Sequence, residues 1–387
     1  MRRIPWLLLP LLIGSAVGSD IPLSVGRSFV LHSENLGEDR LVSIFLPEGY
    51  DETSEKYPVL YLLDAETHLL HAGSSARLLG LLGAMPHIIV VGIANTDRTR
   101  DMTPTLTRPD KDYPGAGGSA KFLAFLRSEL KPYIRSHLRT EPFSILAGTS
   151  LSGLFVTNAF VADPESFDAY FAASPSLWWD EGRASDELIA ALQRHESRPK
   201  FLFISLAGGD SDSLRRNTQR VLDALEHRET DSLASQHAYF GDESHNSTPL
   251  PSFYAAFKWL YAGWRPAVAS SLRDLEQHYE SMSRRYGYHV AVPDTEINNV
   301  AYSLLYSDHK AEAIDLFKLN TGNSPGSANA WDSLGEAYRS AGDLASSVAA
   351  YRKACVLGRR FRSPHSAEYC SNLESVGRQF RAAEKGK

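Results

Sequence analysis

The sequence has little cysteine, no excess of basic residues and no hydrophobic run long enough for a polytopic membrane protein. Its 387 residues include two cysteines, which excludes a disulfide-rich scaffold and any zinc or iron–sulfur site built from several cysteines. Lys and Arg total 40 against 46 Asp and Glu, so the net charge is −6 and neither nucleic acid nor an anionic membrane surface is expected as partner. The composition, 43% hydrophobic and 22% charged, is that of a globular protein with a large core and not of a disordered chain.

The first nineteen residues have the pattern of a signal peptide. Arg2 and Arg3 precede an apolar run at 6–13, and small residues follow at 14–19. The run is short for a membrane span, so a retained anchor is the less favoured alternative. We therefore expect an exported protein, periplasmic or secreted, with no membrane span after cleavage. Export would permit a disulfide between Cys355 and Cys370, with two buried free thiols as the alternative.

Residues 20–265 alternate between short apolar runs and longer amphipathic stretches. The runs predict strands at 41–46, 57–63, 87–93, 143–147, 169–173 and 200–206. Helical periodicity falls between them, at 119–136, 214–227 and 250–263. Because most of the runs are continuously apolar, this part predicts an α/β fold with a mostly parallel sheet covered by helices on both faces.

The remainder of the chain has only helical periodicity. Residues 266–292 predict a helical linker, and 293–387 a small all-α region. Trp331, Leu334, Gly335 and Tyr338 fit the W-x2-L-G-x2-Y signature of a tetratricopeptide repeat. A step back of about 34 residues gives a second, weaker match. The surface of such repeats is a candidate site for a protein partner.

A serine on a tight turn follows the strand predicted at 143–147. The segment 148–153 has the sequence GTSLSG and precedes a helix-compatible stretch. A nucleophilic serine between a strand and a helix, flanked by small residues, is typical of α/β hydrolases. Ser150 is the candidate nucleophile, although Ser152 replaces the second glycine of G-x-S-x-G. The alternative is a Ser/Thr-rich turn that caps a helix.

A serine nucleophile needs a general base and an acid that orients the base. The strand at 200–206 ends in AGGDSD, which offers Asp210 and Asp212. We prefer Asp212, because Gly209 and the two following residues give the chain room to turn, with Asp210 a close second. His245 lies in a turn before the last helix of the α/β region, which makes it the candidate base.

Two backbone N–H groups are expected to stabilise the oxyanion of acyl transfer. Leu151, which follows the nucleophile, supplies one. The loop after the strand at 57–63, around Ala65, supplies the other. His68 and His71 have a helical i, i+3 spacing but no evident third ligand. We therefore expect neither a metal nor a cofactor.

Together these residues resemble the esterases related to enterochelin esterase and esterase D. The resemblance rests on YPVLYLLD at 57–64, VGIANTDR at 91–98, SPSLWW at 174–179, the serine turn and the His245 loop. It covers nearly the whole chain after the leader, since some members carry a similar C-terminal repeat region. It implies an α/β-hydrolase fold and ester hydrolysis by Ser150, His245 and one of the two aspartates. Ala65 and Ser152 replace glycines that are usual in the family, and both substitutions fall at the oxyanion site.

Two functions remain open on the sequence. The favoured one is an exported serine esterase acting on a small-molecule ester, for which a siderophore lactone, a short acyl ester and a cell-wall ester are candidates. The alternative is a weakly active or inactive hydrolase shell that binds a protein through its repeats. Trp178 and Trp179 are candidates either to stack on an aromatic substrate or to fill the core. Arg98, Arg100 and Asp101 form either a structural ion-pair cluster or an anion site.

Overall fold

A computed structural model describes residues 24–52, 54–194, 198–228 and 232–385. The expected signal peptide at 1–19 lies outside these residues. Within them, no helix combines the length and apolar character needed to cross a bilayer.

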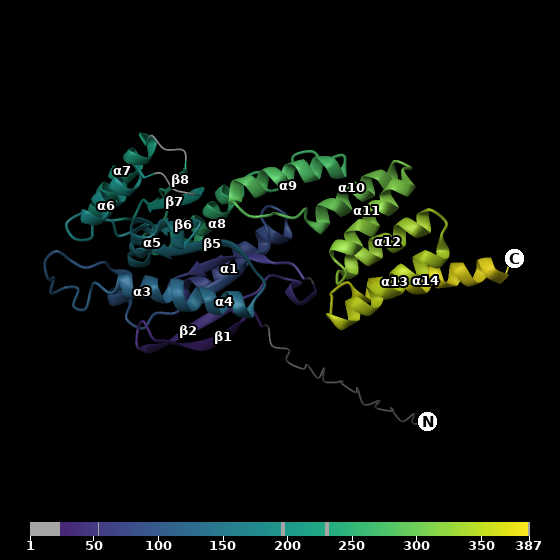
Figure 1. Ribbon diagram of the computed structural model, residues 1–387, viewed down its shortest axis with the longest axis horizontal. Helices are drawn as coiled ribbons and strands as arrows, with labels where there is room; N and C mark the ends of the chain where they lie inside the picture. Colours follow the sequence, from purple (N-terminus) through teal and green to yellow (C-terminus); the bar gives the residue numbers. More distant parts are fainter. Residues whose placement is uncertain (1–23, 53, 195–197, 229–231, 386–387) are drawn as a thin grey trace, which may run out of the picture.

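An eight-stranded sheet with the order β1-β2-β4-β3-β5-β6-β7-β8 forms the centre of the first part of the chain (Figure 1). The strands are β1 (Arg27–Ser33), β2 (Glu38–Phe45), β3 (Tyr57–Leu62), β4 (Ile89–Ile93), β5 (Thr140–Thr149), β6 (Ala169–Ala173), β7 (Lys200–Ala207) and β8 (Leu233–Phe240). β2 pairs antiparallel with both β1 and β4, and all other pairs are parallel. The predicted mostly parallel sheet is therefore confirmed.

Helices cover both faces of the sheet, and each face has its own core. The helices of this part are α1 (Ala65–Leu81), α2 (Arg98–Met102), α3 (Ser119–Phe125), α4 (Lys131–His137), α5 (Leu151–Ala162), α6 (Arg183–Ala191), α7 (Asp212–Glu226) and α8 (Pro249–Leu260). Alternate residues of a strand point to opposite faces. In β3, Val59 and Tyr61 accordingly join the core that contains α3 to α7, whereas Leu60 and Leu62 join the core that contains α1 and α8.

Two strands were not predicted, and both lie at the sheet edges. β8 has the sequence LASQHAYF, and only Leu233 within it is fully buried. β1 is likewise exposed over most of its length. An edge strand carries half of its side chains in solvent, so it lacks the apolar run that marks the central strands.

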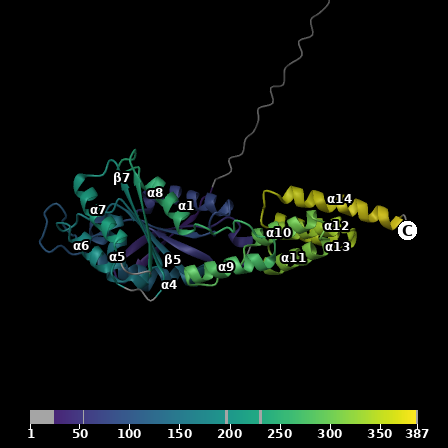
Figure 2. The ribbon, with the colours of Figure 1, turned by 90° about the horizontal axis from the view of Figure 1, so that it is seen from above.

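In the described part of the chain, six more helices follow α8: α9 (Leu272–Tyr286), α10 (Asp294–Tyr306), α11 (Lys310–Asn323), α12 (Ala328–Ser340), α13 (Leu344–Arg360) and α14 (Ser366–Lys385). Figures 1 and 2 show α9 between the α/β part and the C-terminal helices. Leu275, Tyr279 and Tyr286 of α9 are buried in the same core as α1 and α8. Segment 266–292 thus packs on the sheet layer as well as connecting two regions.

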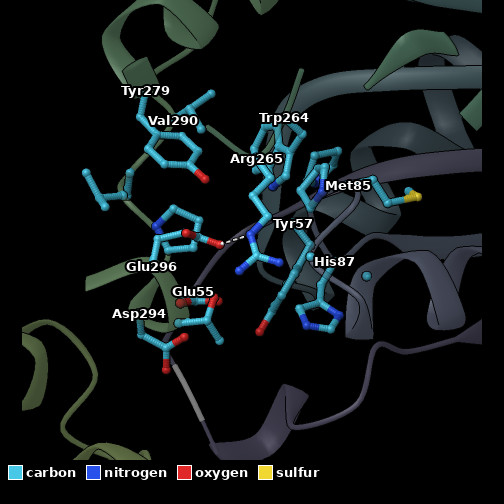
Figure 3. A pocket seen from close by; sticks show the side chains of 18 of the residues that line it. Glu55, Tyr57, Met85, His87, Trp264, Arg265, Tyr279, Val290, Asp294 and Glu296 are labelled. Carbon is cyan, nitrogen blue, oxygen red and sulfur yellow. Dashed lines mark ion pairs between the residues drawn. The ribbon is translucent and has the colours of Figure 1, made fainter. Parts of the chain in front are cut away.

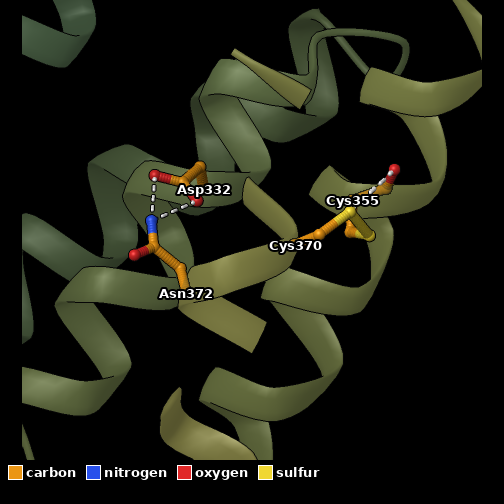
Figure 4. The surroundings of a disulfide bond; sticks show 4 residues. All are labelled: Asp332, Cys355, Cys370 and Asn372. Atoms are coloured by element: carbon orange, nitrogen blue, oxygen red, sulfur yellow. Dashed lines mark hydrogen bonds between the residues drawn. A yellow bond between two sulfur atoms is a disulfide. The ribbon is translucent and has the colours of Figure 1, made fainter. Parts of the chain in front are cut away.

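The last helices pack in sequence order, α12 on α13 and α13 on α14. Close packing of the first pair requires a glycine, since a Cβ on Gly335 would lie 2.8 Å from the Tyr351 ring. A disulfide joins Cys355 of α13 to Cys370 of α14, with the two Cα atoms 4.7 Å apart (Figure 4). This pairing decides between the bridge and the two free thiols that the sequence left open.

Candidate active site

The candidate nucleophile Ser150 lies on a strained turn between β5 and α5. Its backbone has φ 57° and ψ −118°, a conformation that non-glycine residues rarely adopt. Small neighbours make the turn possible, because a Cβ on Gly148 would lie 2.6 Å from the carbonyl oxygen of Ser152. The turn is anchored to the next strand by a 3.0 Å hydrogen bond from Ser150 N to the carbonyl of Ala173.

His245 connects this serine to a buried carboxylate. Its Nε2 lies 3.0 Å from Ser150 Oγ, and its Nδ1 lies 2.6 Å from Asp210 Oδ1. The other oxygen of Asp210 accepts hydrogen bonds from Ala207 N at 2.7 Å and from Ser174 Oγ at 2.8 Å. Burial alone would raise the pKa of Asp210, but these hydrogen bonds outweigh it and lower the pKa. The carboxyl group is therefore ionised and accepts at both oxygens.

Our preference for Asp212 over Asp210 is wrong in this geometry. Asp212 is the first residue of α7, and its side chain is 76% exposed. It pairs with Arg215 one helical turn away, whereas Nδ1 of His245 is bonded to Asp210. The chain turns back at Asp210, before Ser211 caps α7, so that only the first aspartate reaches the histidine.

The two expected oxyanion donors lie at the ends of neighbouring strands. Leu151 begins α5 directly after β5, and Ala65 begins α1 shortly after β3. β3 and β5 are paired in parallel, with Leu62 opposite Ala147. The first N–H groups of a helix have no acceptor within the helix, so both are available to a substrate oxygen.

Two serines of the site were not predicted. Ser174 holds Asp210, as described above, and Ser176 Oγ lies 3.4 Å from Ser150 Oγ. Both belong to the SPSLWW segment that follows β6. Parallel strands end at the same edge of a sheet, and β6 pairs directly with β5. That adjacency is the signal that would have placed these serines near Ser150.

The structure separates the two tryptophans of this segment. Trp179 is 1% exposed, and its Nε1 donates to the carbonyl of Pro104, so it belongs to the core. Trp178 is half-buried, and its ring centroid lies 5.8 Å from that of Tyr113. Trp178 is thus the member of the pair that a substrate could contact.

The arginine cluster divides in a similar way. Asp101 is buried and accepts from Arg40 and Arg100, which makes these residues part of a structural ion-pair network. Arg98 instead forms a two-pronged pair with Asp64, at 2.8 and 2.9 Å. In the described part of the chain, no group of three or more His, Cys, Asp or Glu side chains is arranged to hold a metal.

A cavity of about 500 Å³ lies where the central strands β3 and β5 begin, at the opposite end of these strands from Ser150 (Figure 3). Its wall includes Tyr57 at the start of β3, Trp264 after α8, and an Arg265–Glu296 ion pair of 3.1 Å. Ser150 follows the far end of β5, and ten strand residues at about 3.3 Å each separate the two places by roughly 30 Å. The cavity is therefore distinct from the Ser150 site.

Comparisons with known proteins find esterases among the relatives of this chain. The model of the family described as "Putative esterase" matches residues 33–275. The ferri-bacillibactin esterase BesA of Bacillus subtilis is 29% identical over 217 residues, which cover 49% of this chain and 74% of that protein. The siderophore triacetylfusarinine C esterase of Aspergillus fumigatus is 27% identical over 175 residues, or 41% of this chain and 59% of that protein. The crystal structure of an IroE-like serine hydrolase from Shewanella oneidensis has 28% identity and a TM-score of 0.68, covering 78% of this chain and 99% of that one.

Proposed function

This chain is a serine esterase that belongs to the "Putative esterase" family, and on that premise we propose that it cleaves carboxylic esters through an acyl-enzyme on Ser150. The observation that carries the proposal is the continuous hydrogen-bonded chain from Asp210 through His245 to Ser150, with distances of 2.6 and 3.0 Å. The same hydrogen-bonded order of carboxylate, histidine and serine catalyses acyl transfer in hydrolases of several unrelated folds.

The chemistry follows from this order of groups. As Ser150 Oγ attacks the ester carbonyl carbon, its proton passes to His245 Nε2, and Asp210 stabilises the resulting imidazolium. The N–H groups of Leu151 and Ala65 stabilise the negative carbonyl oxygen of the tetrahedral intermediate. The intermediate collapses when His245 protonates the leaving alkoxide, which departs as the alcohol. Water then repeats the same steps on the acyl-enzyme and releases the acid.

We assign to the substrate an aromatic acyl or catechol group of the kind found in siderophore esters. Two relatives are named a ferri-bacillibactin esterase and a siderophore triacetylfusarinine C esterase, which favours a siderophore ester. The aromatic group is inferred from the half-buried Trp178, which follows Ser176 by two residues. Tyr113 lies beside it and supplies a second aromatic ring. Offset or edge-on contacts with two rings would favour an aromatic acyl group over an aliphatic one of equal size.

A fluorophosphonate probe tests the nucleophile. Wild-type protein should be labelled at Ser150 and Ser150→Ala should not, whereas Ser176→Ala, which removes the neighbouring hydroxyl, should still be labelled. Equal labelling of wild type and Ser150→Ala would remove the basis of the proposal. A series of p-nitrophenyl esters of increasing acyl length, run beside a catecholate siderophore ester, then tests the substrate class.

We further propose that the protein is exported and that residues 293–387 form tetratricopeptide-like repeats. The signal-peptide pattern at 1–19 and the Cys355–Cys370 disulfide both suit an oxidising compartment. Close packing of Gly335 against Tyr351 suits the repeat pattern. Sequencing the N-terminus of protein recovered from the periplasm or medium tests export. A protein partner for this region, and the inactive-shell alternative, stay predictions; the Asp210–His245–Ser150 hydrogen bonds favour the enzyme.

A further inference from the structure

Two residues with unfavourable backbone conformations flank the site of the proposed oxyanion. Ser150 precedes Leu151 with φ 57°, and Asp64 precedes Ala65 with φ 52°. Each therefore sets the direction of one of the two N–H donors. Residues persist in such conformations only where surrounding contacts hold them, so the contacts between these two turns matter for the geometry of the donors.

Ser152 connects the two turns through its side chain. This hydroxyl is fully buried and accepts a 2.7 Å hydrogen bond from Thr149 N, directly before the nucleophile. It lies 2.7 Å from Asp64 Oδ2 and 2.8 Å from the carbonyl of Thr149. A hydroxyl has one proton, and the ionised carboxylate is the stronger acceptor. The hydrogen bond to Asp64 thus links the first turn of α5 to the turn that follows β3.

The carboxylate of Asp64 is itself held rigidly. It accepts two hydrogen bonds from Arg98 and a third from Asn95 at 2.7 Å, in addition to that of Ser152. Arg98 also reaches the carbonyl of Thr149 at 3.3 Å. Burial would raise the pKa of Asp64, but these donors lower it, so the acceptor is charged. Without the Ser152 hydroxyl, Arg98 would still connect Asp64 to the carbonyl of Thr149, but at the longer distance of 3.3 Å.

We infer that Ser152 is a positioning residue of the esterase site, whose hydroxyl fixes the Leu151 N–H relative to the Ala65 N–H. The inference rests on the proposed function of Ser150. It gives a role to the residue that breaks the G-x-S-x-G pattern: a glycine there would leave Thr149 N without this acceptor and Asp64 without one donor. Ser152 itself does not touch the reacting atoms.

Ser152→Ala and Ser152→Gly test the inference in the full-length protein. Removal of one oxyanion donor typically costs 100- to 1,000-fold in kcat, and displacement costs less. We therefore expect kcat for p-nitrophenyl acetate to fall by about 10- to 100-fold in both variants, with KM within about twofold. Inhibition by phenylboronic acid, whose adduct with Ser150 places a negative oxygen between the two donors, should weaken by a similar factor.

The control is Ser347→Ala, which removes another fully buried hydroxyl, one that donates to the carbonyl of Gly335 in the helical region. It should change the melting temperature comparably and leave kcat and boronate affinity unchanged. Wild-type kcat in Ser152→Gly, or a lower kcat with unchanged boronate affinity, would overturn the inference. Should Ser152→Ala not fold, Ser152→Gly alone gives the answer. A wild-type protein that the fluorophosphonate probe does not label would instead refute the proposed function.

Discussion

Replacing Asp210 by asparagine should remove nearly all esterase activity while leaving the fold intact. The side chain is buried and nearly isosteric with its replacement, so the change is one of hydrogen-bonding character. Ala207 N lies 2.7 Å from Oδ2 and can only donate. The amide oxygen of the asparagine must therefore occupy the Oδ2 position, and its NH2 group must face His245.

The magnitude follows from the tautomer that this arrangement imposes. An NH2 group opposite Nδ1 of His245 requires that nitrogen to accept, which leaves the proton on Nε2. A protonated Nε2 cannot take the proton of Ser150 Oγ, 3.0 Å away. The same change in a serine protease lowers kcat by about 10⁴-fold, which corresponds to roughly 5 kcal/mol in the activation barrier.

Asp212→Asn is the matched control two residues away. Asp212 is exposed, and its ion pair with Arg215 lies on the helix surface, so its loss should change stability by less than about 1 kcal/mol and kcat by less than about twofold. Initial rates on p-nitrophenyl acetate, per mole of protein that melts normally, provide the comparison. A tenth or more of wild-type kcat in Asp210→Asn, with a large loss in Asp212→Asn, would refute the assignment made from the hydrogen bonds.

Three further predictions concern the C-terminal helices, and esterase rates should be unchanged in each. Reducing the Cys355–Cys370 disulfide, which closes a 15-residue loop, should lower the free energy of unfolding by about 3 kcal/mol; a double serine variant should not respond to reductant. Gly335→Ala should lower the free energy of unfolding by about 1 to 3 kcal/mol, because its Cβ would overlap the Tyr351 ring. Gly322→Ala, which has open space around its Cβ, should not lower it, and equal losses in the two variants would contradict the packing argument. Burial raises the pKa of Asp332 to about 6, so ionisation destabilises the fold as pH rises between about 4 and 6. The free energy of unfolding of Asp332→Asn should therefore exceed that of the wild type by about 1 kcal/mol at pH 8, a value reduced for the partial exposure of the side chain, and should equal it below pH 4. Thermal melts at both pH values provide the measurement.

The central strands were predictable because strands buried on both faces consist of continuous runs of apolar residues. β3, β4 and β6 are buried at every position, and a strand covered on both faces must be apolar throughout. The edge strands β1 and β8 carry mixed side chains, since solvent reaches one face or one edge, and were missed. The turn at Ser150 was predictable for a related reason, since close packing of a strand against the following helix restricts Gly148 to the smallest residue.

What the sequence by itself determined is the kind of fold and the type of side chains at its site: a mostly parallel sheet, a serine after the fifth strand, an acid after the seventh and a histidine before α8. The tertiary structure alone decided which of two near-equivalent residues points inward. Asp210 rather than Asp212 meets His245, because the turn after β7 directs one carboxylate to the Ala207 N–H and the other to solvent. Trp179, and not Trp178, is fully buried. Ser152 forms a hydrogen bond with Asp64, which lies 88 residues away in the sequence. Directions of this kind depend on backbone angles and long-range contacts, which residue types and their spacing do not specify.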